Sequence, residues 1–316
     1  MAPLLQMIDL KKYFQVGRNR YLHAVDGVNL AINQGCTLGV VGESGCGKST
    51  LGMVVLRLLE PTGGQVLFQG QDIMKYKKRQ EHLIRRQMQI IFQDPFSSLD
   101  PRMPVSDLIS EPLVMNHVYT NRAEQTRRVL QLMEMVGLAE RYINTYPHEM
   151  DGGRRQRVGV ARALALNPKF IVCDEPVSAL DVSIQAQILN LLMDLQEELD
   201  LTYMFITHDL SVVKHISNEI AVMYLGQCVE HSPSRELFKN PLHPYTRALL
   251  SAVPIPKLNR GKKRQIIRGE VSDPVDPQPG CRFASRCEFV TDKCLGRDVP
   301  LKDMGNGHSV ACRLYD

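Results

Sequence analysis

The chain has 316 residues, of which 44% are hydrophobic and 23% charged, and its formal net charge is +4. This length is typical of two domains, and the composition supports a sizeable core while excluding wholesale disorder and a nucleic-acid coat protein. No apolar run approaches the roughly 20 residues that span a bilayer, and the first residues lack the regions of a signal peptide. We therefore expect any membrane association to be peripheral, from the cytoplasm.

The hydrophobic pattern predicts an α/β fold when it is followed along the chain. Residues 7–40 alternate between apolar and polar, which is typical of strands, and helical periodicity over 104–140 is interrupted at Pro112. Further strands are predicted at 37–41, 65–68, 88–92, 170–173, 203–206 and 220–224, and helices at 48–59, 152–166 and 184–199. This alternation predicts a mostly parallel sheet covered by helices, with a small β layer before it and a helical insert over about 95–165.

A phosphate-binding motif follows the predicted strand 37–41. The sequence GESGCGKS at 42–49 fits G-x-x-x-x-G-K-[ST], in which glycines let backbone N–H groups curl around a phosphate at a helix N-terminus. Lys48 is expected to reach the β- and γ-phosphates of ATP, and Ser49 to hold Mg²⁺. The residues expected to bind the nucleotide here are Gly42, Glu43, Ser44, Gly45, Cys46, Gly47, Lys48, Ser49 and Thr50.

An acidic pair follows the buried strand 170–173. Asp174 and Glu175 come at its carboxyl end, where a parallel sheet presents its ligands. We expect Asp174 to complete the Mg²⁺ shell and Glu175 to polarise the attacking water. An ordinary acidic turn is the alternative interpretation of this pair.

With these motifs in order, residues 1–231 resemble the nucleotide-binding subunit of an ATP-binding cassette (ABC) transporter. The resemblance implies that Gln93 contacts Mg²⁺, the attacking water and the membrane subunit, and that His208 contacts the γ-phosphate. It also implies that Phe14 stacks on adenine and that Asp181 belongs to the D-loop. Singly, Gln93 could be a turn residue, His208 a strand-end cap and Phe14 plain core.

The family signature, Leu-Ser-Gly-Gly-Gln, corresponds to residues 150–154, MDGGR. The resemblance implies that Asp151, Gly152 and Gly153 bind the ATP held by a second cassette. A carboxylate about 4 Å from the γ-phosphate would repel it by around 4 kcal/mol per unit-charge pair at an effective dielectric near 20. One hypothesis is therefore a heterodimer with one weakened site. The other is that Asp151 turns away and caps the helix that begins at Gly152.

The last part of the chain narrows the resemblance. Residues 240–250, NPLHPYTRALL, and 280–287, GCRFASRC, resemble the region that follows the cassette in oligopeptide and dipeptide importers. This implies a second domain over 232–316. It also implies that this chain lies at the cytoplasmic face of the membrane. Its expected partners are two transmembrane permease subunits, a second and different cassette and, indirectly, an extracytoplasmic substrate-binding protein. Nickel-chelate, glutathione and antimicrobial-peptide importers share these features. The rivals are a soluble ABC protein and a P-loop kinase or GTPase.

Four of the eight cysteines, Cys281, Cys287, Cys294 and Cys312, crowd this C-terminal part, which is also rich in proline and is expected to be small and irregular. Five, six and seventeen residues separate them, whereas structural zinc usually takes closer pairs. Four thiolates around a [4Fe–4S] cluster need not follow ferredoxin spacings, and the resemblance points to such a cluster. Zinc and four reduced thiols are the alternatives.

Two basic stretches remain, Lys75–Arg86 and Arg260–Arg268. Aromatic residues are sparse in both, so a solvated face is favoured over contact with lipid headgroups, and no nucleic-acid partner is expected.

Overall fold

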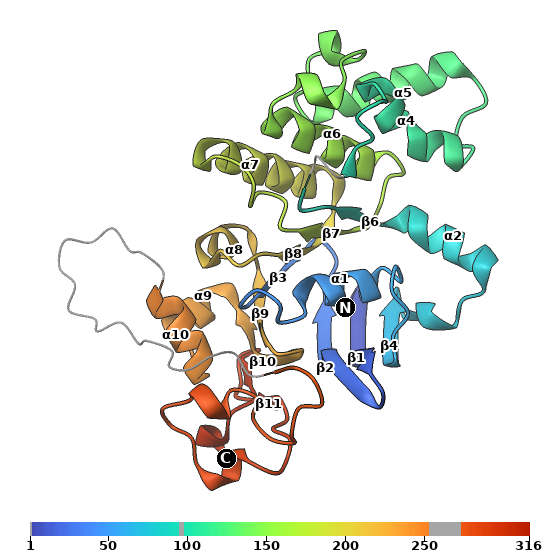
Figure 1. The fold of residues 1–316 in the computed structure, drawn as a ribbon. Coiled ribbons are helices and arrows are strands. Elements are labelled where there is room, and N and C mark those ends of the chain that lie inside the picture. Colours follow the sequence, from blue (N-terminus) through green and yellow to red (C-terminus); the bar gives the residue numbers. More distant parts are fainter. Residues whose placement is uncertain (1, 95–97, 253–272) are drawn as a thin grey trace, which may run out of the picture. The chain divides into compact units, whose positions relative to one another are not determined.

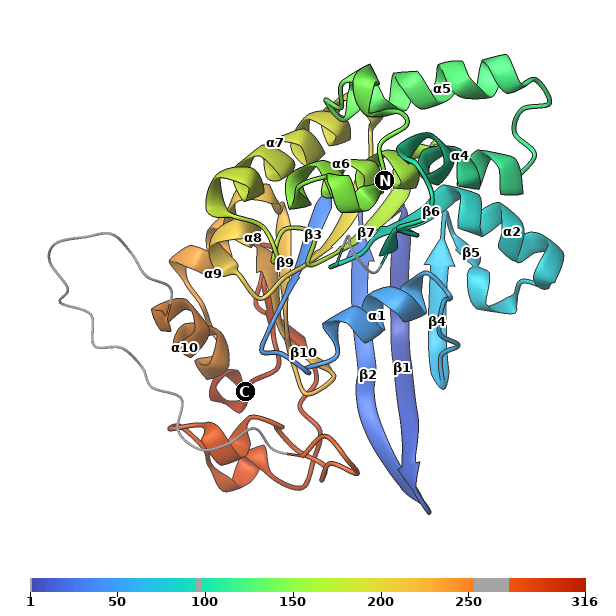
Figure 2. The same cartoon turned by 45° about the horizontal axis from the view of Figure 1, so that its top comes forward.

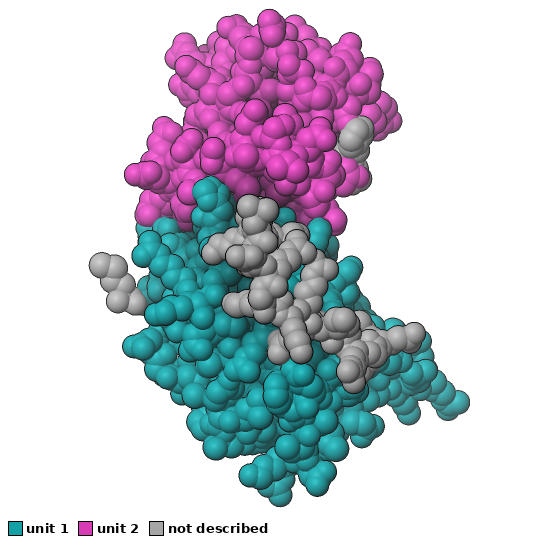
Figure 3. All heavy atoms as spheres, turned by 90° about the vertical axis from the view of Figure 1, so that its left-hand side faces the viewer, with its two compact units in different colours: residues 1–75, 205–316 teal, residues 76–204 magenta. Residues whose placement is uncertain are grey.

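A computed structural model describes residues 2–94, 98–252 and 273–316. The chain forms two compact units (Figure 3): unit 1 comprises residues 1–75 and 205–316, and unit 2 comprises residues 76–204. The division falls within strand β8 (Thr202–Ile206). The predicted basic stretch Arg260–Arg268 lies outside the described residues.

Unit 1 contains an antiparallel sheet in the order β2-β1-β4-β5. Alternate residues of β1, such as Leu5 and Met7, are buried, which explains the period-two pattern of the sequence. Helix α1 lies against β1 and β2 (Figure 2). The strands are β1 (Leu5–Gly17), β2 (Arg20–Ile32), β4 (Gly63–Phe68) and β5 (Gln71–Asp72), the last of which leads into the 3₁₀ turn η1 (Ile73–Lys75). Helix α1 spans Lys48–Val55.

A second group of strands in unit 1 has the order β11-β12-β10-β9-β3 and includes the last residues of β8. Strands β3 and β9 are parallel and almost wholly buried, so their sequences are continuous apolar runs. The strands are β3 (Thr37–Val41), β9 (Glu219–Tyr224), β10 (Gln227–Pro233), β11 (Lys302–Asp303) and β12 (Ser309–Val310), and the helices are α8 (Leu210–Ile216), α9 (Ser234–Lys239) and α10 (Pro244–Ala252).

The C-terminal residues of unit 1 are mostly irregular, as expected, with the short 3₁₀ turns η4 (Ala284–Arg286), η5 (Asp292–Cys294) and η6 (Arg313–Tyr315). They pack on the same core as the strands. Phe283 lies in a hydrophobic cluster with Val41, Tyr224 and Tyr245, and β12 pairs with β10. Figure 1 shows this segment, in red, beside β10. The predicted division at 231/232 stays a prediction.

Unit 2 holds the parallel pair β6 and β7 together with helices, and α4, α5 and α6 pack against one another (Figure 1). The strands are β6 (Met88–Ile91) and β7 (Phe170–Asp174), the helices are α2 (Lys78–Gln87), α4 (Val105–Met115), α5 (Arg122–Met135), α6 (Gly152–Leu164) and α7 (Val182–Leu199), and the 3₁₀ turns are η2 (Glu140–Tyr142) and η3 (Pro147–Glu149).

Two details of the predicted helices are wrong. Helix α4 continues through Pro112 and ends at Met115, with the break at residues 116–121. Helix α1 ends at Val55, four residues before the predicted end, because Arg57 adopts a left-handed conformation with φ +56°. Most of the basic stretch Lys75–Arg86 lies in helix α2, which the sequence pattern did not predict. No helix of the described residues is long and apolar enough to cross a membrane.

Candidate functional site

The phosphate-binding loop joins β3 to α1 in unit 1, and close packing fixes its glycines. Gly47 has φ +102°, and a Cβ there would lie 1.9 Å from the carbonyl oxygen of Ala24. Gly42 has φ +155°, and a Cβ there would lie 2.2 Å from the carbonyl oxygen of Met223. Only glycine fits such contacts. The motif is therefore set by its packing as well as by phosphate binding.

Lys48 opens α1 and its side chain turns back over the loop. Its Nζ donates hydrogen bonds of 2.9 Å to the carbonyl oxygens of Gly42 and Glu43, and the residue is 6% exposed. Ser49 follows Lys48 in the first turn of the helix. Within the loop, burial raises the pKa of the Cys46 thiol. The backbone N–H groups at this helix start and the Lys48 ammonium can together bind a phosphate chain.

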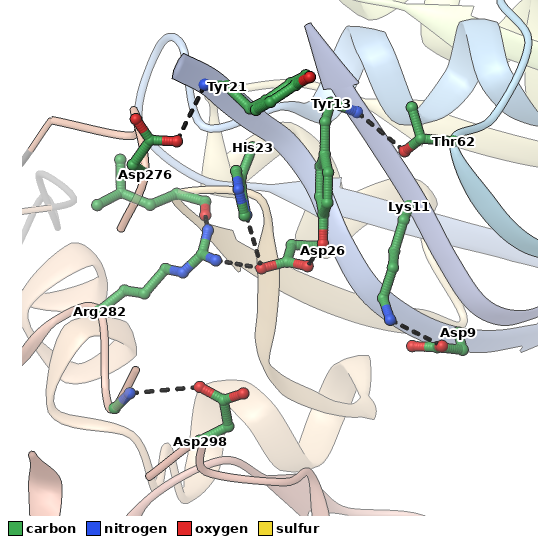
Figure 4. Close-up of polar contacts among 12 residues, drawn as sticks. Asp9, Lys11, Tyr13, Tyr21, His23, Asp26, Thr62, Asp276, Arg282 and Asp298 are labelled. Atoms are coloured by element: carbon green, nitrogen blue, oxygen red, sulfur yellow. Dashed lines mark hydrogen bonds and ion pairs between the residues drawn. The ribbon is translucent and has the colours of Figure 1, made fainter. Parts of the chain in front are cut away.

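Two aromatic residues of β1 lie on opposite faces of the strand. Phe14 is half-buried and opposes Leu22, with Lys12 Nζ 5.0 Å from its ring centroid. Tyr13 stacks on His23, with centroids 3.9 Å apart, and donates its hydroxyl proton to Asp26 (Figure 4).

Asp26 also accepts hydrogen bonds from His23 Nδ1, at 3.3 Å, and from Arg282 of the C-terminal segment (Figure 4). Burial opposes ionisation of Asp26, but the hydrogen bond from Tyr13 and the charge of Arg282 hold its pKa below the usual value.

His208 lies in the loop that follows β8, beside the strand that leads into the phosphate-binding loop. The N–H of Thr207 donates to the carbonyl oxygen of Val40, at 3.2 Å, which joins the ends of β8 and β3. Asp209 caps α8 through Ser211 N, at 2.7 Å. His208 itself is exposed. His208 therefore lies near the end of β3, from which the phosphate-binding loop also starts.

In unit 2 the structure brings two predicted catalytic residues together. Gln93 follows β6 and Glu175 follows β7, and Gln93 Nε2 donates to Glu175 Oε2 at 3.0 Å. Asp174, the last residue of β7, is 6% exposed. Glu175 has φ +46°, a conformation that costs a non-glycine residue of order 1–3 kcal/mol. Asp181 is the N-cap residue of α7, six positions later.

The signature segment places Asp151 as the N-cap of α6. Its carboxylate accepts the N–H of Arg154 at 2.8 Å and pairs with the guanidinium of the same residue at 2.6 Å. Gly153 is buried, and a Cβ there would lie 2.7 Å from Ile184 Cγ2. In this geometry Asp151 caps α6, as the second of the two hypotheses for this residue states.

The four C-terminal cysteines are half-buried free thiols. Burial, and to a smaller extent the nearby Cys294, Cys287 and Cys312, raise the pKa of Cys281 to about 11. Cys281 N donates to the carbonyl oxygen of Cys294 at 2.8 Å.

The thiols thus lie near one another in one region of unit 1. Within the described parts of the chain, no three His, Cys, Asp or Glu side chains are arranged to hold one metal ion.

Sequence reasoning missed four residues around the phosphate-binding loop and β2, namely Asp26, Tyr245, Arg282 and Arg286. Tyr245 Oη accepts the backbone N–H of Glu43 at 2.8 Å, and Arg286 binds the Glu43 carboxylate. Tyr245 and the two arginines lie in the segments 240–250 and 280–287, which gave only a family resemblance. Their partners are more than 200 positions away in sequence, so no local signal could have found these contacts.

Comparison with known proteins agrees with this geometry. The ABC transporter family profile matches residues 25–178, and the profile of the oligopeptide/dipeptide transporter C-terminal region matches residues 229–294. A dimeric ATP-binding cassette bound to ADP and Pi is similar in structure, with a TM-score of 0.66, 30% identity, and coverage of 73% of this chain and 99% of that one. CbiO1 of Clostridium perfringens, part of an ABC transporter complex, is similar with a TM-score of 0.68 and 28% sequence identity. The match covers 76% of this chain and 92% of CbiO1. The fold and site therefore define a P-loop ATPase of the ABC cassette class.

Sequence relatives cover nearly the whole chain. The chain is 49% identical over 315 residues to the putative oligopeptide transport ATP-binding protein YkfD of Bacillus subtilis, covering 99% of this chain and 96% of the relative. It is 48% identical over 321 residues to the dipeptide transport ATP-binding protein DppF of Escherichia coli, and the match covers 99% of this chain and 95% of DppF. The chain belongs to the family of oligopeptide and dipeptide transport ATP-binding proteins, and it is an ATPase subunit of an ABC transporter.

Proposed function

We propose that this subunit binds ATP at Gly42–Thr50, with Phe14 against the base, and hydrolyses it with Glu175 to energise peptide import. The observation that carries the catalytic assignment is the 3.0 Å hydrogen bond from Gln93 Nε2 to Glu175 Oε2. It places an amide and a carboxylate at the carboxyl ends of two adjacent parallel strands, where such sheets present ligands.

In the proposed reaction, a water oxygen attacks the γ-phosphorus while Glu175 accepts the water's proton. The new P–O bond forms as the bond from the γ-phosphorus to the bridging oxygen breaks, and ADP leaves with the electron pair. Gln93 orients the water and the carboxylate. Lys48 and His208 stabilise charge on the γ-phosphate oxygens.

Magnesium, when bound, neutralises charge on the β- and γ-phosphates. Its proposed ligands are Ser49, Gln93 and Asp174, which offer the oxygen atoms that this ion prefers. Its position as the last residue of β7, at the carboxyl end of a parallel strand where such sheets present ligands, supports the role of Asp174.

The proposed assembly is a heterodimer of two cassettes with two transmembrane permease subunits, at the cytoplasmic face of the membrane. Asp151, Gly152, Gly153 and Asp181 would face the nucleotide of the second cassette. An extracytoplasmic binding protein would act on this chain only indirectly. The relatives are oligopeptide and dipeptide transport proteins, which supports a peptide cargo over a nickel chelate, glutathione or an antimicrobial peptide.

The test replaces Glu175 with Gln in the assembled transporter. Phosphate release should fall by at least about 100-fold, since general-base catalysis contributes roughly 10²–10⁴-fold. ATP binding should be retained, because the amide preserves the shape of the side chain. Glu198→Gln, at an exposed position of α7, is the matched control and should leave turnover unchanged. Full turnover in the Glu175 variant would overturn the assignment.

We also propose that the four C-terminal thiols hold a [4Fe–4S] cluster, with a structural or redox-sensing role. The hydrogen bond of 2.8 Å from Cys281 N to the Cys294 carbonyl, which brings two of the four cysteine positions together, supports it. A cluster fits better than one zinc ion because each thiolate binds its own iron, so the four need not converge on one point.

Anaerobically purified protein should then be brown, with broad absorption near roughly 400 nm. Cys287→Ser should bleach this colour, whereas Cys36→Ser, at a half-buried cysteine far away in sequence, should keep it. Colourless protein with one tightly bound zinc, or with four titratable thiols, would refute the cluster.

A further inference from the structure

The second residue of the phosphate-binding loop is held at three points. Its backbone N–H donates to Tyr245 Oη at 2.8 Å, its carbonyl oxygen accepts Lys48 Nζ at 2.9 Å, and its carboxylate is bound by Arg286. Two of these partners of Glu43, Tyr245 in α10 and Arg286 at the end of η4, come from the C-terminal part of unit 1. The C-terminal region thus forms part of the support of the loop.

The contact between Arg286 and Glu43 is bidentate. Arg286 Nη1 lies 2.8 Å from Oε2 of Glu43, and Nη2 lies 3.3 Å from Oε1. The side chain of Arg286 is 8% exposed and that of Glu43 26%. The paired carboxylate raises the pKa of Arg286, so the guanidinium stays charged at every physiological pH. Planar pairs of this kind fix geometry as well as charge.

The aromatic core of unit 1 holds Arg286 in place. Its Nη1 donates to Tyr224 Oη at 3.3 Å, and its guanidinium lies 5.9 Å from the Tyr224 ring centroid. Phe283, three residues earlier, packs edge-on against Tyr224 and also contacts Tyr245, with centroids 5.3 and 5.4 Å apart. The arginine is therefore a fixed part of the fold rather than a mobile surface side chain.

A carboxylate within a phosphate-binding loop is an electrostatic problem. Glu43 carries a negative charge in the loop that is proposed to surround a triphosphate, and like charges at short range repel. A released carboxylate could also turn to the Lys48 ammonium and compete with the nucleotide for it, since Lys48 already contacts the carbonyl of Glu43.

We propose that Arg286 is a positioning residue for ATP binding: it neutralises the Glu43 carboxylate and holds it away from the phosphate cradle. Through this pair the cysteine-bearing segment, in which Arg286 directly precedes Cys287, sets the affinity of the loop for nucleotide. The inference rests on the proposed ATP site at Gly42–Thr50.

The experiment titrates the full chain with magnesium and the non-hydrolysable analogue AMP-PNP by calorimetry. Arg286→Gln should raise the Kd by about tenfold, because removing one partner leaves the other charge uncompensated. Glu43→Gln in the same chain should recover most of that loss, and Arg286→Lys should lose less than Arg286→Gln. The loss should also shrink at high salt, where charge repulsion is screened.

Arg313→Gln is the matched control. Arg313 lies in the same C-terminal segment, where it pairs with Asp316 at 2.9 Å and donates to the carbonyl oxygen of Asp298 at 3.0 Å. It should leave the Kd unchanged.

Three outcomes would overturn the inference. They are an unchanged Kd for Arg286→Gln, an equal loss for Arg313→Gln, and failure of Glu43→Gln to rescue Arg286→Gln. A Lys48→Ala variant that binds AMP-PNP normally would instead refute the proposed ATP site itself. A thermal melt of each variant shows whether it has folded, and Arg286→Lys keeps the test open if Arg286→Gln has not.

Discussion

The phosphate-binding segment of unit 1 and the segment of unit 2 that we propose to activate water are built in different ways. In unit 1, Gly42 and Gly47 pack against backbone carbonyls, and Glu43 has three anchors. In unit 2, the Glu175 carboxylate accepts a hydrogen bond from Gln93, which is exposed. A loop that binds a phosphate chain gains from being preorganised, whereas residues that act on a water depend on a local contact that can be rearranged.

This difference implies that substitutions in unit 1 act on folding and affinity together. Substitutions at the strand ends of unit 2 should act on turnover with little effect on stability. The following predictions sharpen that contrast.

The largest effect is expected at Gly47. In Gly47→Ala the added Cβ would meet the Ala24 carbonyl at 1.9 Å, so the loop must move. We expect loss of AMP-PNP binding and a clear drop in Tm. Gly45→Ala is the matched variant, because Gly45 has φ +78° but no atom within 4 Å of the added Cβ. It should lose only the roughly 1–2 kcal/mol that a left-handed alanine costs. Equal losses would show that conformation, not packing, fixes the loop.

A smaller effect is expected from pH, through His243. This buried residue accepts the Tyr245 N–H on Nδ1 at 3.1 Å, and burial lowers its pKa to about 4. The unfolded chain binds the proton below about pH 6.5, so the stability that neutral His243 provides is present above that pH. It is lost progressively as the pH falls toward 4.

The expected loss is about 3 kcal/mol at most. His243→Asn keeps a hydrogen-bond acceptor but does not titrate, so Tm should fall less steeply between pH 6.5 and 4 than in the wild type. Identical slopes for the two proteins would contradict this assignment.

The smallest effect is expected at Asp151 in unit 2. Asp151→Ala removes the N-cap of α6 and should lower the free energy of unfolding by about 1 kcal/mol. Asp151→Ser retains a capping oxygen and should lose much less. Chemical denaturation of both variants is the measurement. A serine variant as unstable as the alanine variant would mean that the ion pair with Arg154, not the cap, stabilises the helix start.

Much of the fold could be predicted because the signals are local. The apolar run of β3 and the glycines after it specify a strand, a tight loop and a helix within twenty residues, and β3 has the predicted bounds. The acid pair after β7 is likewise placed by its strand. The predicted break at Pro112 is wrong, because α4 continues through this proline. The proline in the sequence does not reveal that α4 packs against α5 and α6.

The sequence by itself therefore determined the phosphate-binding loop, the strand ends that carry Gln93 and Glu175, and the family of the chain. Only the tertiary structure decided that the C-terminal segment supports that loop. Arg286 meets Glu43 across 243 positions and Arg282 meets Asp26 across 256. Such pairs leave no periodic pattern or motif in the sequence. They form because Phe283 packs with Tyr224 in one core, which places the neighbouring arginines of the same segment beside their partners.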